Sequence, residues 1–506
     1  MLCSSFAVNL VYMDCSRPSR RQALLWASLG AAMPLTGACE ATSTSAPASN
    51  ILATGLEVVT VTDTSVVITW FTGSATAVDQ YGSPVLRPVA TDTELKLGSV
   101  DPATQTVVPG SLKTVLHDAT PTPYHYAEVS DLEPGTTYAY AALSSGQAAR
   151  QTSMQFPVGV GGSLDYPGVF TTLTTPPGSY LFTLALSNDL HVGEAESGII
   201  ANGWPPHFEQ NPGLPPYPVV MLEAMLGDLR RPDRRADRLI VAGDLTAGAL
   251  PAEVARVRQM LDGWGKLQTD YFVARGNHDR SRVGSAYKSC ATVPSAPDHR
   301  DCWRGMFPYP LQQLQVYEVG GLRLIGLDTT TLDAPGGTMD ANQLGALSDV
   351  LQKDSHRPTM LFGHHPVTYE SAATTAAGPS FDIDRPTAVA LQRLYERSPG
   401  VFFHHSGHTH RNKRTFMLDQ DQSPIQSIEF LEVGATKEYP GGYSLLRLYT
   451  GGYIVSYYKN RTNLALAWSQ RTRGEYYNLY AHSMLGTIAD RNHSVTRDLS
   501  GLTPIS

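Results

Sequence analysis

Five short apolar segments of this 506-residue chain run directly into residues that can bind a metal ion or transfer a proton. The segments are LFTLALS, LIVA, YFVA, TMLF and VFFHHS. The residues that follow them are Asp189 and His191, Asp244, Asn277 with His278 and Asp279, His364, and His408 with His410. Carboxylate, amide and imidazole groups without a thiolate favour Mn, Fe, Zn or Co over softer metals. The set is larger than one ion requires, so it predicts two divalent metal ions that share a carboxylate.

The apolar segments predict the strands that position these residues. They are short and almost continuously apolar, and segments able to form helices, such as residues 251–267, separate them. Continuous hydrophobicity is typical of sheets that are buried on both faces. Because open α/β sheets assemble their sites at the carboxyl ends of strands, we expect an α/β layered domain over residues 178–460 with one pocket there.

The spacing inside the loops predicts their local conformation. Asp189 and His191, like His408 and His410, are two residues apart, which fits an extended segment whose alternate side chains point the same way. Glycines stand before four of the predicted ligands, and we expect them to let the backbone turn sharply. These ligands are Asp244, Asn277, His364 and His408.

Other polar residues near the motifs are predicted to have structural roles. His365, His404 and His405 are expected to be hydrogen-bonded residues of the core rather than ligands. Arg280 and Arg411 flank the motifs. Each is equally well explained as a phosphate-binding residue or as a solvent-exposed surface residue.

The ordered motifs resemble those of the calcineurin-like metallophosphoesterase superfamily, which are D-x-H, G-D, G-N-H-[DE], H and G-x-H. In this chain they are Asp189-Leu190-His191, Gly243-Asp244, Gly276-Asn277-His278-Asp279, His364 and Gly407-His408-Thr409-His410. The resemblance implies a first metal bound by Asp189, His191, Asp244 and His410, and a second bound by Asp244, Asn277, His364 and His408. It also implies that His278 is a general acid and that Asp279 fixes its tautomer.

The same resemblance implies the reaction. A hydroxide that bridges the two metals would attack the phosphorus of a small phosphoester, and a phosphodiester is favoured over a monoester. Purple acid phosphatases are similar, but Ala247 stands where they carry a metal-binding tyrosine. The alternatives are a nucleotidase or monoester phosphatase, and a non-catalytic cell-surface binding protein. A net charge of −8 predicts no polymeric nucleic acid as partner.

Residues 51–173 predict a separate all-β sandwich. Short alternating segments such as LEVVTVT and SVVITWFT are divided by turn residues. HYAEVSDLEPGTTYAYAA resembles the fibronectin type III signature, in which Trp70, Tyr138 and Tyr140 would be packing residues. The expected fold is therefore an N-terminal fibronectin III-like sandwich, followed by an α/β layered metallophosphoesterase domain built as a β-sandwich flanked by helices.

The ends of the chain and the cysteines predict an exported protein. Residues 1–39 resemble a twin-arginine export signal, with Arg20 and Arg21 before an apolar stretch that is too short to span a membrane. Cys39 is a candidate lipid-attachment site, and residues 40–50 are predicted to be a tether. Cys290 and Cys302 are predicted to form a disulfide, as expected in an oxidising compartment.

Three further segments complete the predicted organisation. The insertion at 192–236, which contains Trp204 and His207, and the loop between the two cysteines are predicted to border the metal pocket. Residues 443–460 are predicted to form a closing hairpin, and residues 461–506 a C-terminal extension. The sequence leaves the metal pair and the oligomeric state open.

Overall fold

The computed structural model describes residues 51–78, 84–151, 168–198, 208–418, 423–475 and 481–505. The predicted export signal, the tether and Cys39 lie outside these described residues, as do Trp204 and His207. Within the described ranges, no helix is both long enough and apolar enough to cross a membrane.

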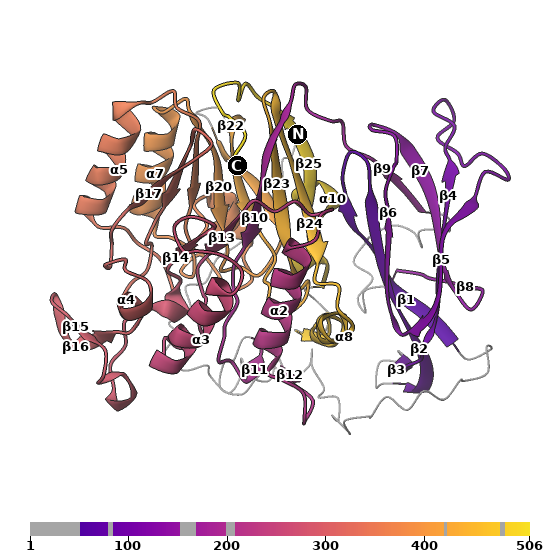
Figure 1. Ribbon diagram of the computed structural model, residues 1–506, viewed down its shortest axis with the longest axis horizontal. Helices are drawn as coiled ribbons and strands as arrows, with labels where there is room; N and C mark the ends of the chain where they lie inside the picture. The colour runs from indigo at the N-terminus through magenta and orange to yellow at the C-terminus, as the bar shows by residue number, and fades with distance from the viewer. Residues whose placement is uncertain are drawn as a thin grey trace, which may run out of the picture.

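The N-terminal part consists of two antiparallel sheets that pack on a common core (Figure 1). One sheet contains β1 (Ile51–Val61), β2 (Val66–Val78), β3 (Pro84–Pro88) and β6 (Tyr124–Val129). The other contains β4 (Thr91–Ser99), β5 (Lys113–Thr122), β7 (Thr137–Ser144), β8 (Gln147–Ala148) and β9 (Gly168–Thr171). Trp70 and Tyr140 are buried in this core and Tyr138 packs against it, which confirms their predicted role in packing. The assignment to fibronectin type III stays a prediction.

The C-terminal part contains two six-stranded mixed sheets. The first has the order β14 (Tyr271–Ala274), β13 (Arg238–Ala242), β10 (Tyr180–Ser187), β23 (Gly442–Tyr449), β24 (Gly452–Lys459) and β25 (Asn492–Thr496). The second has the order β17 (Gln315–Val319), β18 (Leu322–Gly326), β19 (Thr359–Phe362), β20 (Val401–Ser406), β22 (Pro424–Glu432) and β21 (Lys413–Leu418). The strands predicted from the apolar segments are thereby confirmed.

Helices cover the outer faces of both sheets (Figure 1). The longer ones are α2 (Tyr217–Leu229) and α3 (Pro251–Asp262) beside the first sheet, and α5 (Ala341–Lys353) and α7 (Arg385–Glu396) beside the second. Leu324 of β18 belongs to the core between the sheets, whereas its neighbour Ile325 packs with residues of α5 and α7. Both faces of the strand are buried, which explains why the strand sequences are continuously apolar rather than alternating.

The chain after residue 441 completes the first sheet. The predicted hairpin is confirmed, because β23 and β24 pair as antiparallel neighbours. β25, from the segment predicted to be a C-terminal extension, pairs with β24 at the edge of the sheet. The same segment contains α8 (Asn463–Thr472), α9 (Ala481–Leu485) and α10 (Ile488–Arg491).

The remaining short elements lie in the connections. They are β11 (Glu196–Ser197), β12 (Phe208–Glu209), β15 (Ala291–Val293), β16 (Ala296–Asp301), α4 (Trp303–Met306) and α6 (Tyr369–Thr374). The predicted disulfide between Cys290 and Cys302 is present, with the two Cα atoms 4.8 Å apart, and it encloses the β15–β16 hairpin. Closing a loop of this length stabilises the fold by about 3 kcal/mol in the chain-entropy description.

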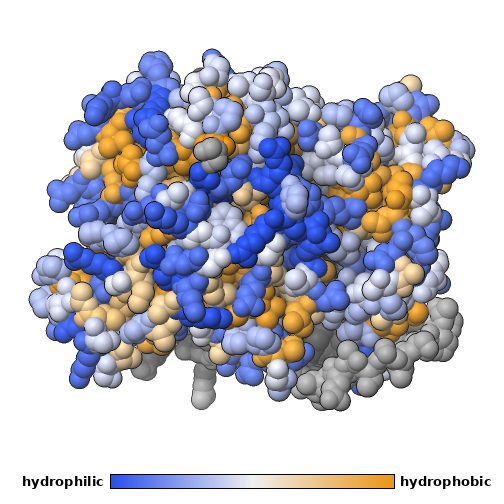
Figure 2. All heavy atoms as spheres, viewed as in Figure 1, coloured by the Kyte–Doolittle hydropathy of each residue, from blue (hydrophilic) through white to orange (hydrophobic). Residues whose placement is uncertain are grey.

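The two parts of the chain meet along β1. On the face shown in Figure 2 they form one continuous surface in which hydrophilic and hydrophobic residues are interspersed. Thr60 Oγ1 donates to the carbonyl of Tyr457 at 2.5 Å, and Arg491 Nε donates to the carbonyl of Val59 at 2.9 Å. The buried carboxylate of Glu57 accepts hydrogen bonds from Lys459 Nζ at 2.5 Å and from the Tyr439 hydroxyl at 2.8 Å. The N-terminal sandwich is therefore joined to the second part by buried polar contacts.

Glu57→Gln is expected to destabilise the protein near neutral pH and not in strong acid. Burial would raise the pKa of Glu57, but Lys459 and Arg473 lower it to about 2. Because this folded-state pKa lies below the ordinary value of 4.5, the carboxylate stabilises the fold above that value, and its contribution disappears as the pH falls toward 2. We expect urea unfolding to show a loss of about 3 kcal/mol near neutral pH.

The matched control is Glu94→Gln in the same sandwich. Glu94 pairs with Lys96 at 3.5 Å on the surface, so its loss should cost less than about 1 kcal/mol. Equal effects of the two substitutions at neutral pH would contradict a stabilising role for Glu57.

Candidate metal centre

The predicted ligands come together at the carboxyl ends of strands from both sheets of the C-terminal part. The loops after β10, β13 and β14 supply Asp189 and His191, Asp244, and Asn277. The loops after β19 and β20 supply His364, and His408 with His410. Contacts of 2.9 to 3.7 Å connect all of these side chains, as expected from the sequence.

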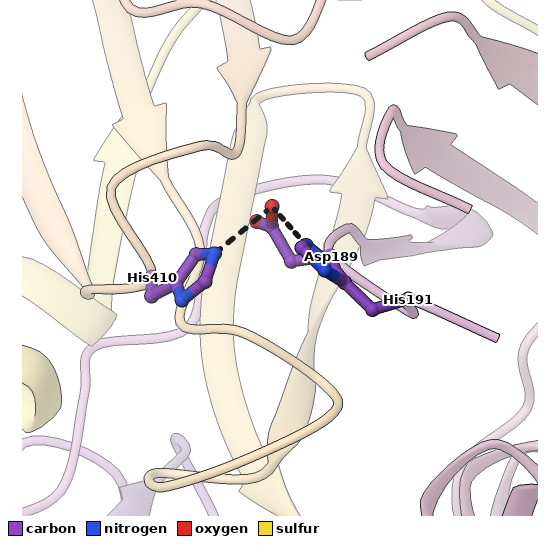
Figure 3. A group of neighbouring side chains, drawn as sticks. All are labelled: Asp189, His191 and His410. Carbon is purple, nitrogen blue, oxygen red and sulfur yellow. Dashed lines mark ion pairs between the residues drawn. The ribbon is translucent and has the colours of Figure 1, made fainter. Parts of the chain in front are cut away.

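The first cluster consists of Asp189, His191 and His410 (Figure 3). Figure 3 shows the carboxylate of Asp189 between the two imidazole rings. Asp189 Oδ1 lies 3.3 Å from His410 Nε2 and 3.7 Å from His191 Nε2. One potential ligand atom of each residue lies within 4.8 Å of the others, which is close enough to surround a single ion.

The second cluster consists of Asp244, His364 and His408. His364 Nε2 lies 3.2 Å from Asp244 Oδ2 and 3.1 Å from His408 Nδ1. Asn277 Oδ1 adds a fourth potential ligand atom, 2.9 Å from His364 Nε2.

One oxygen atom of Asp244 connects the two clusters. Asp244 Oδ2 lies 3.4 Å from His191 Nε2 as well as 3.2 Å from His364 Nε2. The other oxygen, Oδ1, accepts a hydrogen bond from the backbone N–H of His278 at 2.7 Å, which fixes the orientation of the carboxylate. This is the geometry that a carboxylate shared by two ions requires.

The hydrogen bonds of His364 and His408 show which of their ring nitrogens can bind a cation. His364 Nδ1 lies 2.9 Å from the carbonyl oxygen of Ala242, and His408 Nε2 lies 2.7 Å from that of Phe381. Because a carbonyl oxygen only accepts, each of these nitrogens carries a proton, so His364 Nε2 and His408 Nδ1 are the nitrogens left to bind a cation. Asp244 Oδ2 lies beside His364 Nε2 and is a further potential ligand atom.

The first cluster fits a cation for a similar reason. Asp189 Oδ1 and both ring nitrogens of His191 are buried and have no hydrogen-bond partner among the described residues. Buried polar atoms in native proteins are nearly always paired, so three such atoms at one place indicate a missing ligand. A divalent ion bound by imidazole and carboxylate groups satisfies this requirement.

The charges of the carboxylates agree with this interpretation. Burial would raise the pKa of Asp189, but His410 and His191 hold it well below its usual range. Burial acts in the same way on Asp244, but His364 holds the pKa of that carboxyl well below its usual range. Both groups are therefore anionic at neutral pH.

The backbone of the ligand loops is left-handed, and the expectation of extended segments was wrong. The φ angles are 50° at Asp189, 44° at His191, 52° at Asp244, 71° at His408 and 57° at His410. This conformation costs roughly 1 kcal/mol or more for a residue with a side chain, and such residues are concentrated at functional sites. Backbone hydrogen bonds hold the loops in place, including one from Asp189 N to the carbonyl of Gly243 at 3.0 Å.

The glycines before the ligands allow close approach more than sharp turns. Gly243 has a φ of 90°, and a Cβ atom there would lie 2.6 Å from His364 Nδ1. Gly276 lacks a left-handed φ, but a Cβ atom there would lie 2.2 Å from Asp244 Oδ1. The predicted turn is therefore correct at Gly243, whereas Gly276 is needed because the Asp244 carboxylate packs against its backbone.

The predicted contact between Asp279 and the ring of His278 is wrong. Asp279 accepts hydrogen bonds from the backbone N–H groups of Leu245 at 3.0 Å and Thr246 at 2.9 Å, so it holds the loop that follows Asp244. His278 Nδ1 instead lies 2.7 Å from the carbonyl oxygen of Ala247. This carbonyl fixes the tautomer with the proton on Nδ1. Burial lowers the pKa of His278 to about 4, so the ring is neutral and Nε2 is a proton acceptor.

The three other histidines have the structural roles that were predicted. His365 Nδ1 lies 2.7 Å from Thr329 Oγ1, His404 Nδ1 lies 3.0 Å from the hydroxyl of Tyr395, and His405 Nε2 lies 3.1 Å from the carbonyl of Ser187. All three rings are buried.

The two flanking arginines have different environments. Arg411 is buried and donates to Glu432 Oε2 at 2.8 Å, so it is neither a surface residue nor free to bind phosphate. Arg280 is partly exposed and donates to the carbonyl of Asn277 at 3.0 Å.

Sequence reasoning missed the buried charged residues behind the first cluster. Glu438 Oε1 lies 2.5 Å from His410 Nδ1, and Lys437 is buried beside it. Glu194, in the insertion predicted to border the pocket, lies 3.6 Å from His191 Nδ1. The position of Glu194 three residues after His191 was the only signal in the sequence, because Lys437 and Glu438 belong to none of the five motifs.

Comparison with known proteins agrees with this site. Residues 182–412 match the family described as calcineurin-like phosphoesterase. A curated protein from Synechococcus sp., described as a probable cyclic nucleotide phosphodiesterase, is 29% identical over 163 residues, which are 31% of this chain and 54% of that protein. The matched region thus spans about half the length of this curated relative.

Several solved structures are also similar. A dimetal phosphatase from Danio rerio is 14% identical with a TM-score of 0.40, and the match covers 56% of this chain and 97% of that one. A purple acid phosphatase from yellow lupin (Lupinus luteus) is 15% identical with a TM-score of 0.37, covering 82% and 72%. PhoD is 12% identical with a TM-score of 0.34, covering 80% and 85%. The family match covers residues 182–412, the part of the chain that carries both clusters.

Asp244→Asn is expected to lower metal binding without unfolding the protein. The amide keeps the size of the carboxylate but loses the charge that both clusters share, so the metal content after reconstitution should fall sharply. Metal analysis after dialysis, together with circular dichroism, measures the two effects. Asp328→Asn is the matched control, since Asp328 is equally buried but belongs to neither cluster. Unchanged metal content in Asp244→Asn would contradict the shared role.

Proposed function

We propose that this chain is an exported metal-dependent phosphoric ester hydrolase that acts on small phosphodiesters. The observation that carries the proposal is the position of Asp244 Oδ2, 3.4 Å from His191 Nε2 and 3.2 Å from His364 Nε2. A single carboxylate oxygen between two imidazole clusters suits a pair of divalent ions, which is the arrangement that phosphoester hydrolysis uses.

The residues of the site have distinct tasks in this reaction. When bound, two divalent ions neutralise the phosphate oxygens and lower the pKa of a water molecule so that it can attack phosphorus near neutral pH. Asp189, His191, Asp244 and His410 would hold one ion, and Asp244, Asn277, His364 and His408 the other. Ionised Asp189 and Asp244 supply the negative charge that this site needs.

His278 would transfer the proton in this reaction. Its ring centroid lies 4.4 Å from that of His191, and its Nδ1 is engaged by the carbonyl of Ala247. Only Nε2 is available for exchange with the leaving-group oxygen. Because the resting ring is neutral, His278 must accept a proton before it can donate one.

Two observations support the preference for a diester. They are the similarity to the Synechococcus protein and the residues of the D-x-H and G-N-H-D motifs. A nucleotidase or monoester phosphatase is the alternative that an activity test separates. A polymeric nucleic acid is not proposed as substrate, since the chain has a net charge of −8.

Export is supported by the disulfide between Cys290 and Cys302, which is typical of oxidising compartments. The twin-arginine signal in residues 1–39 belongs to the same proposal, with Cys39 as a candidate lipid-attachment site, as does the fibronectin III-like identity of the N-terminal sandwich. The two-sheet packing around Trp70 supports the last of these.

A substrate panel tests the proposed function. We expect the protein reconstituted with Mn, Fe, Zn or Co to hydrolyse bis-p-nitrophenyl phosphate and cyclic nucleotides faster than the corresponding monoesters. Faster hydrolysis of monoesters would favour the alternative, and a lack of hydrolysis with every metal would overturn the proposal.

His278→Ala is expected to affect substrates according to their leaving groups. An alkoxide needs a proton when it departs, so kcat for alkyl esters should fall by about 10²- to 10⁴-fold. A p-nitrophenolate departs without one, so kcat for p-nitrophenyl esters should fall far less. Steady-state kinetics with both substrate classes measures the difference, and equal losses would contradict the proton-transfer role.

A further inference from the structure

The two clusters differ in the groups that lie beside the outward-facing ring nitrogens of their histidines. In the second cluster the acceptors are backbone carbonyls, with Ala242 at 2.9 Å from His364 Nδ1 and Phe381 at 2.7 Å from His408 Nε2. In the first cluster they are carboxylates. Glu438 Oε1 lies 2.5 Å from His410 Nδ1, and Glu194 Oε1 lies 3.6 Å from His191 Nδ1.

A buried lysine joins the two carboxylates of the first cluster. Lys437 Nζ donates to Glu194 Oε2 at 2.6 Å and forms an ion pair with Glu438 Oε2 at 3.0 Å. Its side chain is only 2% exposed, so water does not screen these contacts. We call Glu194, Lys437 and Glu438 the Lys437 cluster.

Neighbouring residues fix the positions of the two carboxylates. The hydroxyl of Tyr217 donates to Glu194 Oε2 at 2.7 Å, and Ser197 Oγ donates to Glu438 Oε2 at 2.5 Å. Each glutamate therefore has one oxygen held by Lys437 and a hydroxyl, while the other oxygen faces a histidine of the first cluster.

The main chain of Lys437 is also fixed to the metal site. Its backbone N–H donates to the carbonyl of Asp189 at 3.2 Å, and its own carbonyl accepts from Trp468 Nε1 at 2.8 Å. A displacement of Lys437 would therefore move Asp189 through the backbone hydrogen bond. It would also move His191 and His410 through the two glutamates.

A carboxylate and a carbonyl have different effects on a histidine that binds a metal. A charged acceptor at Nδ1 forms a stronger hydrogen bond than a neutral carbonyl and makes the other ring nitrogen a better electron-pair donor. Such outer groups typically change metal affinity by about 10- to 100-fold. The histidines of the first metal position therefore have carboxylates behind them, whereas those of the second have only backbone carbonyls.

We propose that the Lys437 cluster is a positioning device that makes the first metal position bind its ion more tightly than the second. The proposal rests on the proposed function insofar as both require a pair of divalent ions. Lys437 keeps the two carboxylates together behind His191 and His410, where without its charge they would repel each other.

Titration of the metal-free full chain with Co²⁺ tests this inference independently of catalysis. The visible absorption of Co²⁺ reports binding, and we expect two events that differ in Kd by about 10-fold or more. His410→Ala should remove the tighter event, and His408→Ala should remove the weaker one.

Substitutions in the Lys437 cluster should weaken the tighter event alone. Glu438→Ala is expected to raise its Kd by about 10- to 100-fold, and Glu438→Gln, which retains an acceptor oxygen without the charge, by less. Lys437→Met should also weaken it, because the two glutamates would move away from the histidines. The matched control is Lys459→Met, which removes a second buried lysine that pairs with Glu57 at 2.5 Å. It should lower Tm but leave both Kd values unchanged.

Several results would overturn the proposal. They are equal affinities at the two positions in the wild-type protein, an equal weakening of both events by Glu438→Ala, or a loss of the tighter event in Lys459→Met. Two unequal binding events without phosphoester hydrolysis would refute the proposed function and leave this inference intact. Hydrolysis with two equal binding events would do the reverse.

Discussion

The structure depends on a convergence of nitrogen and oxygen atoms that can bind one cation. His364 Nε2 lies 3.2 Å from Asp244 Oδ2 and 3.1 Å from His408 Nδ1, and each of the three side chains is held by a partner on its far side. Carbonyls accept from the far sides of the two rings, and a backbone N–H binds the far oxygen of the carboxylate. Such an arrangement suits a bound cation, and the surrounding fold keeps it in place.

The loops that hold these atoms in place are conformationally strained, and the packing of the core offsets this strain. Five ligand residues adopt left-handed backbone conformations, and Gly243 and Gly276 leave room for the side chains that pack against them. Asp279 binds the loop after Asp244 through two backbone N–H groups, so a carboxylate with a place in a catalytic motif serves as a structural support. Beneath the loops, strands that are buried on both faces provide the apolar packing that offsets this strain.

The sequence predicted the strands and the clustering of these side chains well because both are encoded locally. Apolar runs end where Asp189, Asp244, Asn277, His364 and His408 begin, and the carboxyl ends of such strands meet in space. The left-handed conformation at Asp189 and His191 could not be predicted, because it results from hydrogen bonds with the distant loop at Gly243 and Asp244. The partner of His278 was missed for the same reason, since the carbonyl of Ala247 is 31 residues away. Lys437 and Glu438 follow no motif, and their importance arises only when residues 194 and 410 are brought beside them.

Each cluster takes its side chains from both sheets, so metal binding there would be linked to folding. Asp189 and His191 follow β10 of the first sheet, whereas His410 follows β20 of the second. Asp244 follows β13 of the first sheet, and its partners His364 and His408 follow β19 and β20 of the second. The donors are close together only while the two sheets are packed, so a ligand that binds them stabilises the packed state over the unfolded chain. The segment that carries Lys437 also contacts the N-terminal sandwich, because Tyr439, two residues later, donates to Glu57 of β1.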